Sequence, residues 1–273
     1  AGHEIISLSR GIRARAHVYP VRNVKLDLVR PEGLGEALHG VAAVIHSAGL
    51  VREEAGQSFE RAHVGATANL IESCTRAGIG KIVYLSALGA NAGSSNLYLR
   101  TKWEAERLVT ECGVPHTIFR PSLIFGAGDR VITGLLSWVR MAPFVPVIGP
   151  DKTKLQPIWV GDVATALVKA AADASTDGRV YELGGPTQMT FADLVETLRG
   201  SSGRSAFSLQ LPAFLATPFM KLGELLMDNP PLTVAQFGAL ALGGTCDPNP
   251  AAVTFGLRMR SLVDVLPEYH RAG

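Results

Sequence analysis

Residues 81–106 read KIVYLSALGANAGSSNLYLRTKWEAE, and this stretch decides the fold. It opens with an apolar run, residues 81–86, whose continuous apolar character is typical of a strand covered on both faces of a parallel sheet. Apolar residues then recur over residues 98–112 with the helical period of about 3.6 residues, and Gly113 and Pro115 follow. The stretch therefore predicts a strand followed by a helix.

The same alternation extends in both directions along the chain. Four further apolar runs predict strands, at residues 4–8, 24–28, 41–46 and 116–120. Residues 57–77 predict another helix, which ends at Gly78. Repeated alternation of strands and helices indicates a doubly wound, Rossmann-type parallel α/β sheet over residues 1–121.

The pattern changes after Pro121, where glycine and proline become frequent. Residues 122–273 are expected to form a mixed region that includes a small C-terminal α+β lobe. Its predicted helices lie at residues 162–172, 190–198, 214–227 and 263–269. Asp162 and Thr190 are expected to be helix N-caps. The amphipathic residues 214–227 are expected to pack in the lobe core, with docking to a partner or a membrane surface as the alternative.

Composition limits the classes of partner. The 273 residues carry 26 basic and 24 acidic side chains without a basic stripe, so nucleic acid is not an expected partner. Cys74, Cys112 and Cys246 fit neither a disulfide framework nor a CxxC motif, which indicates reduced thiols of a cytoplasmic protein. No apolar run reaches the roughly 18 residues of a membrane span. The chain opens at Ala1 without a charged and then apolar leader, so no signal peptide is expected.

Tyr98 and Lys102 carry the strongest chemical signal. They stand four residues apart near the start of the predicted helix, so one helical face presents both side chains. The ammonium of Lys102 is expected to lower the pKa of the Tyr98 phenol, which suits proton transfer at neutral pH. A pair on the helix surface is the alternative, because YxxxK is common by chance. The preceding strand, which ends in Ser86, favours the chemical interpretation.

Other chemistries lack their motifs. The seven histidines show no HxH or HExxH spacing, so no metal site is expected. The sequence has no GxSxG elbow, and this argues against a serine hydrolase.

Several motifs follow one another in a specific order: VIHSAG (residues 44–49), KIVYLSALGA (81–90), YLRTKWEAE (98–106), RPSLIFGAGDR (120–130) and QPIWVGDVA (156–164). In this order they resemble the atypical extended short-chain dehydrogenase/reductases. More narrowly, they resemble the family that comprises the NAD(P)H-binding accessory subunit nine of respiratory complex I and the bacterial relatives of this subunit. PPLTVAQFGAL (230–240) and LVDVLPEYHR (262–271) are similar to the same group, so the resemblance covers nearly the whole chain.

The resemblance implies a site at the carboxyl edge of the sheet. Tyr98 and Lys102 match the family's catalytic pair, with Lys102 also expected on the nicotinamide ribose. Ser86 is expected to bond the substrate carbonyl, with a hydroxyl satisfied by the backbone as the alternative. The implied cofactor-binding residues are Arg10, Asp27, Leu28, Ser47, Ala48, Gly49, Lys102, Pro121 and Ile124.

Arg10 decides the expected cofactor. It stands at the end of the family's second strand, where an acidic residue would accept the ribose 2′-hydroxyl of NAD, whereas an arginine suits the 2′-phosphate of NADP. NADP(H) is therefore favoured over NAD(H), with a merely solvated Arg10 as the alternative.

The sequence departs from the family pattern in two ways. The family's first strand, its Gly-rich turn and the following helix would precede Glu4, and the sequence predicts that they are missing from this chain. In addition, Ala87 and Leu88 follow Ser86 where another hydroxyl is usual, and His63 stands where the family more often has Asn.

These features leave two classes of function open. The favoured one is a nucleotide-binding subunit or assembly factor, associated with a respiratory or other membrane-associated complex and peripheral at the inner membrane. The alternative is an NADP-dependent oxidoreductase or epimerase that acts on a small carbonyl or a sugar nucleotide through Tyr98 and Lys102.

Overall fold

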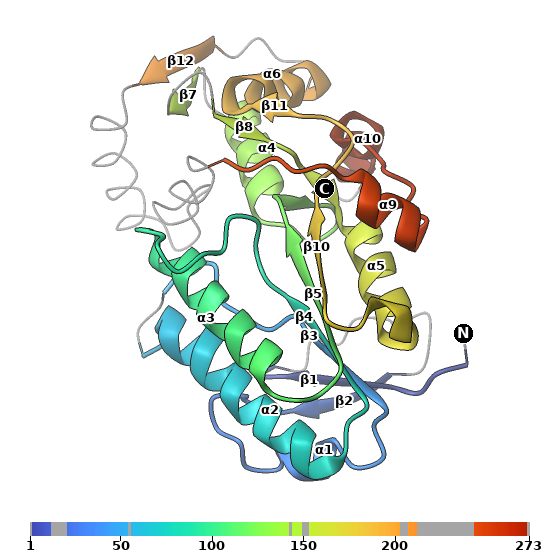
Figure 1. The fold of residues 1–273 in the computed structure, drawn as a ribbon. Helices are drawn as coiled ribbons and strands as arrows, with labels where there is room; N and C mark the ends of the chain where they lie inside the picture. Colours follow the sequence, from blue (N-terminus) through green and yellow to red (C-terminus); the bar gives the residue numbers. More distant parts are fainter. Residues whose placement is uncertain are drawn as a thin grey trace.

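The computed structural model describes residues 2–11, 21–53, 56–141, 144–148, 153–202, 207–211 and 243–271. Within them, a four-stranded parallel sheet has the order β10-β5-β4-β3 (Figure 1). Its strands are β3 (Ala43–His46), β4 (Lys81–Leu85), β5 (His116–Pro121) and β10 (Arg179–Leu183). A second parallel pair joins β1 (Ile5–Ser9) to β2 (Val21–Lys25). This architecture confirms the predicted Rossmann-type α/β fold.

Side chains alternate between the two faces of the central strands. Ile82, Tyr84 and Ile118 pack in one hydrophobic cluster, whereas Val83 and Phe119 pack in another. All five are at most 1% exposed. The continuous apolar runs that predicted β4 and β5 therefore reflect burial on both faces of the sheet.

Helices cover both faces (Figure 1). On one face lie α1 (Leu34–Ala37), α2 (Ala66–Ala77) and α3 (Leu97–Glu111), and on the other lie α5 (Val160–Ala172) and α9 (Asn249–Phe255). A π-helical turn, Glu60–Gly65, leads into α2, and a short 3-10 turn, Ala174–Thr176, follows α5. The predicted end of α2 is confirmed, because Gly78 adopts the left-handed conformation (φ 67°) that favours glycine at this position.

The remaining elements form a smaller lobe beyond the carboxyl ends of the strands (Figure 1). Its helices are α4 (Val131–Met141), α6 (Phe191–Ser202) and α10 (Leu262–Arg271), which share one hydrophobic core. Its strand pairs are β6 (Ile124–Phe125) with β9 (Ile158–Trp159), β7 (Phe144–Ile148) with β12 (Phe207–Leu211), and β8 (Lys154–Leu155) with β11 (Met189–Thr190). The predicted helix at residues 214–227 and the motif at 230–240 lie outside the described residues.

Two predictions about organisation stay predictions. The proposed division after Pro121 is one, and β10, which comes from beyond that residue, pairs with β5. The prediction that the family's first strand is missing from this chain is the other: in the described part of the chain, β1 pairs only with β2 and β3 only with β4. Among these same residues, no helix is both long and apolar enough to cross a bilayer.

The prediction for Asp162 is wrong. Trp159 occupies the N-cap position of α5, and Asp162 lies in the first turn, 1% exposed. Its carboxylate accepts the backbone N–H groups of Arg258 (2.8 Å) and Arg260 (3.3 Å) on either side of Met259, which has a left-handed φ of 54°. Asp162 therefore ties the C-terminal segment to α5 through a contact that local sequence does not reveal.

The prediction for Thr190 is confirmed. Its Oγ1 accepts the backbone N–H of Asp193 (3.1 Å), and the Asp193 carboxylate accepts the N–H of Thr190 (2.9 Å). This reciprocal pair is the capping box that the spacing predicted.

We expect Asp162→Asn to lower the free energy of unfolding by about 2 to 3 kcal/mol, because in this buried side chain an amide group replaces one of the two oxygens that accept a backbone N–H. Urea unfolding measures this change. Glu72→Gln, which removes one side of the exposed Arg76–Glu72 ion pair on α2, serves as the control and should change little. An equally small effect of both substitutions would contradict the proposed anchor.

Candidate functional site

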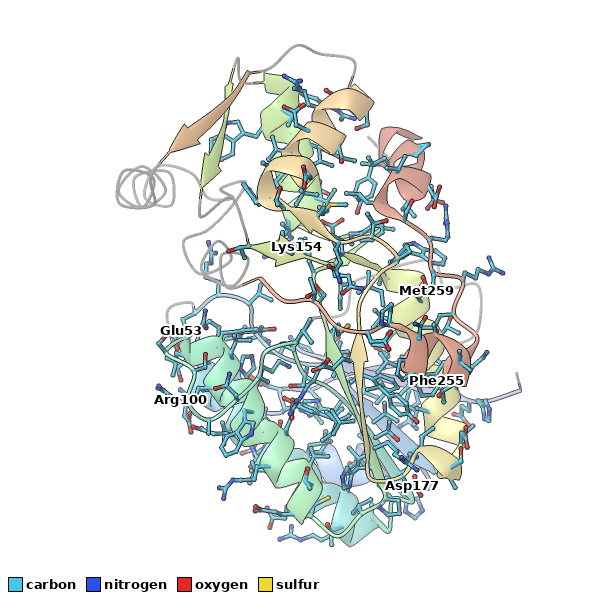
Figure 2. The ribbon with its side chains drawn as sticks, turned by 45° about the horizontal axis from the view of Figure 1, so that its top comes forward. Glu53, Arg100, Lys154, Asp177, Phe255 and Met259 are labelled. Atoms are coloured by element: carbon cyan, nitrogen blue, oxygen red, sulfur yellow. The ribbon has the colours of Figure 1, made fainter. Side chains whose placement is uncertain are left out.

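Most of the predicted site residues lie at one edge of the four-stranded sheet, where the carboxyl ends of β3, β4 and β5 meet. In Figure 2, Glu53 and Arg100 mark the start of α3 near this edge, and Asp177 marks the opposite edge. Asn96 caps α3, because its side-chain oxygen accepts the backbone N–H of Tyr98 (2.9 Å). The cap fixes the first helical turn and with it the start of the YxxxK motif.

Lys102 points its ammonium at the end of β4. Its Nζ donates to the carbonyl of Leu85 (2.8 Å) and lies 5.0 Å from the centroid of the Tyr84 ring. The side chain is buried, which lowers its pKa to about 8, while the carboxylate of Glu106 acts in the opposite direction. The Lys102 side chain is therefore still charged at neutral pH.

The pKa of Tyr98 is raised above its ordinary value, whereas the sequence predicted that it would be lowered. Burial raises it to about 12, whereas the ammonium of Lys102 was expected to lower it. The reason lies in the surroundings: the Tyr98 ring is half-buried and makes edge contacts with the rings of Phe59 (5.7 Å) and His63 (5.5 Å), and Lys102 donates to Leu85. At neutral pH Tyr98 is a phenol that holds its proton.

Ser86 carries a buried hydroxyl without a partner. Its backbone N–H donates to the carbonyl of Phe119 (2.7 Å), but its Oγ has no hydrogen bond within the described structure. Buried hydroxyls nearly always have a partner, which at this sheet edge a bound water or a ligand oxygen would supply. The alternative of a hydroxyl satisfied by the backbone is therefore wrong.

The turn after β3 approaches Lys102 closely. Ser47, Ala48 and Gly49 are exposed. A Cβ atom added to Gly49 would lie 3.2 Å from the His63 ring, which is tighter than ordinary contact, and 3.4 Å from the Nζ of Lys102. Glycine at this position therefore lets the backbone of the turn lie against the Lys102 ammonium.

Arg10, Asp27 and Leu28 lie at the ends of β1 and β2. The Asp27 carboxylate accepts the backbone N–H two residues on (3.1 Å), and the carbonyl of Leu28 accepts the side-chain amide of Asn69 (2.8 Å). Arg10 is exposed, and its guanidinium donates to the side-chain oxygen of Gln57. These three predicted residues thus form a second group, which lies at the ends of the parallel pair β1 and β2 and not at the edge of the four-stranded sheet.

Pro121 and Ile124 border the site on the β5 side. Pro121 ends β5, and its carbonyl accepts the backbone N–H of Leu88 from the loop after β4 (2.9 Å). Ile124 lies on β6 and pairs with Ile158 of β9. The loops after β4 and β5 are therefore joined next to Ser86.

The sequence did not predict an ion pair beneath Lys102. Glu106 is buried, and the guanidinium of Arg120 donates to both its carboxylate oxygens (3.0 Å from Nε, 2.6 Å from Nη2). Glu106 stands one turn after Lys102, so the spacing of Tyr98, Lys102 and Glu106 is the signal that could have found it. Arg120 gave no such signal, because it comes from β5.

Two buried histidines were also missed as members of the site. His46 ends β3 and shares a hydrogen bond of 2.9 Å with the hydroxyl of Thr67. Burial and the nearby Lys102 lower the pKa of His46 to about 3 and that of His63 to about 4. Both rings are therefore neutral at neutral pH.

The sequence and the fold of this chain are similar to those of known proteins. The model of the NAD dependent epimerase/dehydratase family matches residues 1–184. The mitochondrial NADH dehydrogenase (ubiquinone) 1 alpha subcomplex subunit 9 of Arabidopsis thaliana is 37% identical over 178 residues, which cover 64% of this chain and 44% of the relative. The 2-alkyl-3-oxoalkanoate reductase of Stenotrophomonas maltophilia is 25% identical and covers 74% of this chain and 69% of its own. The chain spans about half the length of the subunit 9 relatives that it matches.

A solved structure has the same fold. MoeE5 in complex with UDP-glucose and NAD superposes with a TM-score of 0.76 at 21% identity, over 99% of this chain and 91% of MoeE5.

We expect acid to destabilise the protein through His46 and His63. Their pKa values, about 3 and about 4 in the folded chain, lie below the value of 6.5 for a free side chain. Between those limits the unfolded state binds more protons, so the contribution is complete above pH 6.5 and is lost as the pH falls towards 4. Each histidine contributes up to about 1.4 kcal/mol per pH unit.

Urea unfolding at about pH 7 and about pH 5 measures this dependence. His46→Gln should reduce the difference between the two pH values. An unchanged difference in that variant would show that other groups dominate the acid response.

Proposed function

The chain belongs to the NAD dependent epimerase/dehydratase family, and on this premise we propose that it binds a nicotinamide dinucleotide at the carboxyl edge of β3, β4 and β5. The observation that carries the proposal is the close approach of Gly49 to His63 and to the buried ammonium of Lys102, since a Cβ atom at this position would lie 3.2 Å from the His63 ring and 3.4 Å from the Nζ of Lys102. The exposed turn at Ser47 and Ala48 and the unpaired hydroxyl of Ser86 border the same place. Together they offer an open backbone surface, one cation and one free hydroxyl.

The residues present suit the two ends of such a nucleotide. Lys102 and the turn of Ser47, Ala48 and Gly49 would hold the nicotinamide ribose, and residues 121–124 would border the nicotinamide. Asp27 and Leu28, at the end of β2, would border the adenine. A bound nicotinamide supplies hydride donation or acceptance at its C4 atom.

NADP(H) is our proposed preference within this class. Arg10 is exposed at the end of β1, and its guanidinium is held by an uncharged partner, Gln57, so its charge remains available to a phosphate. Arginine matches the geometry of a phosphate with two parallel hydrogen bonds.

We expect the full-length protein to bind NADPH more tightly than NADH, and Arg10→Glu to narrow or reverse this preference by about 1 to 3 kcal/mol. Calorimetric titration with each nucleotide measures both affinities. Arg22→Glu, at an exposed position on neighbouring β2, is the matched control and should preserve the preference. Equal affinities for the two nucleotides in the starting protein would remove the basis for this proposal.

The proposed biological role is that of a nucleotide-binding accessory subunit or assembly factor of a respiratory or other membrane-associated complex. Its support is the likeness to subunit 9 of the mitochondrial NADH dehydrogenase. In this role the protein works in the cytoplasm or peripherally at the inner membrane, and the nucleotide serves as a structural element.

A second candidate is an NADP-dependent oxidoreductase or epimerase for a small carbonyl or a sugar nucleotide. The unpaired Oγ of Ser86 favours it, because a structural site has no need of a buried free hydroxyl. Tyr98, which holds its proton at neutral pH, would act as the acid towards a carbonyl oxygen, and Ser86 would polarise the same carbonyl. The charge of Lys102 would stabilise the phenolate that remains.

Substitutions at Tyr98 and Lys102 separate the two candidates. If the protein is an enzyme, we expect Tyr98→Phe to reduce turnover by about 100- to 10,000-fold with nearly unchanged nucleotide affinity. Lys102→Ala should reduce both, since it removes the charge and the expected ribose contact. If it is a structural subunit, Tyr98→Phe should leave assembly of the complex intact, and Lys102→Ala should impair assembly only through lost nucleotide.

Turnover on a panel of carbonyl substrates, nucleotide content and assembly are measured for both variants. Lys169→Ala is the matched control, because the Nζ of Lys169 also donates to a backbone carbonyl, that of Phe255 (2.6 Å), but from α5. A Tyr98→Phe protein that keeps full activity on an identified substrate would refute the enzymatic mechanism.

A further inference from the structure

His63 lies between the turn after β3 and the start of α3. It belongs to the π-helical turn Glu60–Gly65 and is 1% exposed. Its ring stacks on Phe59 (5.5 Å) and meets the edge of Tyr98 (5.5 Å). Single π-helical turns are rare and often occur at functional sites, and this one places an imidazole beside the predicted site.

Both nitrogens of the His63 ring have a polar partner. Nδ1 lies 2.9 Å from the hydroxyl of Thr101 on α3, and Nε2 lies 3.1 Å from the backbone N–H of Leu50 in the turn after β3. The Thr101 hydroxyl donates to the carbonyl of Leu97 (2.9 Å), which leaves its oxygen to accept the proton of Nδ1, and we assign this tautomer to His63. Nε2 is then the unprotonated nitrogen that accepts from Leu50.

The charge state of His63 agrees with these bonds. Lys102 and burial favour the neutral ring, and Tyr98 and His46 are also uncharged at neutral pH. A proton on Nε2 would turn this nitrogen towards the Leu50 carbonyl, 3.0 Å away, and would leave the Leu50 N–H without its acceptor. Neutral His63 therefore links the turn to α3 through one donor and one acceptor.

The link bears directly on Gly49. This residue precedes Leu50, and a Cβ atom added to it would meet both the His63 ring and the Nζ of Lys102. Because Leu50 is bonded to His63 and His63 to Thr101, the position of the turn is set relative to the same helix that carries Lys102. Thr101 and Lys102 are adjacent residues of α3, so a shift of the turn changes its distance from Lys102.

We propose that His63 is a positioning residue that clamps the turn of Ser47 to Leu50 against α3 and thereby sets the nucleotide affinity of the site. Its effect on affinity rests on the nucleotide binding proposed above, whereas the clamp itself rests on the hydrogen bonds of His63. The competing interpretation is a histidine that only fills the core. That interpretation predicts a loss of stability without a specific change at the turn.

A substitution at Thr101 gives the sharpest test, because it removes a hydrogen-bond partner of His63 and leaves the His63 ring itself unchanged. We expect Thr101→Val, which is isosteric, to weaken NADPH binding about tenfold in the full-length protein, and Thr101→Ser to restore it. Thr110→Val is the matched control: its hydroxyl also donates to the carbonyl four residues earlier on α3 (2.9 Å), away from His63. Thr110→Val should keep the NADPH affinity of the starting protein.

His63→Phe completes a double-mutant cycle. The phenyl ring keeps the packing on Phe59 and Tyr98 but removes both hydrogen bonds. If the clamp acts as one unit, the double variant with Thr101→Val should bind NADPH no more weakly than His63→Phe alone. Additive losses, equal losses in Thr101→Val and Thr110→Val, or failure of Thr101→Ser to restore binding would overturn the proposal.

A second readout does not depend on nucleotide. In the starting protein, nitrogen NMR should show the Nδ1–H form of His63, and the Leu50 amide should exchange at least tenfold more slowly than in His63→Phe and Thr101→Val. If the starting protein does not bind NADPH, the proposed nucleotide function fails, and exchange at Leu50 still decides whether the clamp exists. Unchanged Leu50 exchange in both variants would refute the clamp itself.

Discussion

A buried ammonium at the end of β4 constrains the rest of the site. Among the described residues, the Lys102 ammonium has the carbonyl of Leu85 as its acceptor and lies over the aromatic face of Tyr84. A buried cation is costly unless it is paired and hydrogen-bonded. Each surrounding residue therefore either stabilises or destabilises the charge of Lys102.

The compensation comes from one turn further along α3. Glu106 acts to keep Lys102 protonated, and the two hydrogen bonds from Arg120 satisfy the same carboxylate. The three charges have a net value of one positive unit, in a region where His46 and His63 are neutral. The Lys102 ammonium is the charge that lies against the turn at Gly49, so the proposed site would place an electron-rich group such as a ribose hydroxyl there.

The sequence predicted what depends on local pattern. The strands at β4 and β5 and the end of α2 follow from apolar runs and glycine, and the shared face of Tyr98 and Lys102 follows from their spacing. The first predicted strands were offset: β2 spans Val21–Lys25 instead of residues 24–28, because pairing with β1 decides its register. Helices α1, α4 and α9 were missed, since α1 is a single turn and the others lie in the Gly- and Pro-rich region.

Residues that act across the fold could not be predicted in the same way. Arg120 and Glu106 come from different elements, as do His63 and Thr101, so no spacing in the sequence reveals either pair. The direction of the Tyr98 pKa shift was missed for a related reason. Spacing indicates which groups share a helical face, but the rings of Phe59 and His63, which bury Tyr98, approach from another segment.

The surroundings of Ser86 are held by both regions of the chain. Gln156 is buried, and its amide donates to the carbonyl of Gly185 (2.8 Å) and accepts the N–H of Cys246 (2.8 Å). Gly244, two residues before Cys246, lies against Leu88, where a Cβ atom would come within 3.1 Å of the side chain.

Leu88 in turn bonds the carbonyl of Pro121, so the loop after β4 is fixed from β5 and from the C-terminal segment. The loop that carries Ser86 is therefore held from two sides. In the enzymatic candidate, this fixed loop would present the Ser86 hydroxyl, which has no partner among the described residues, to the carbonyl oxygen of a substrate.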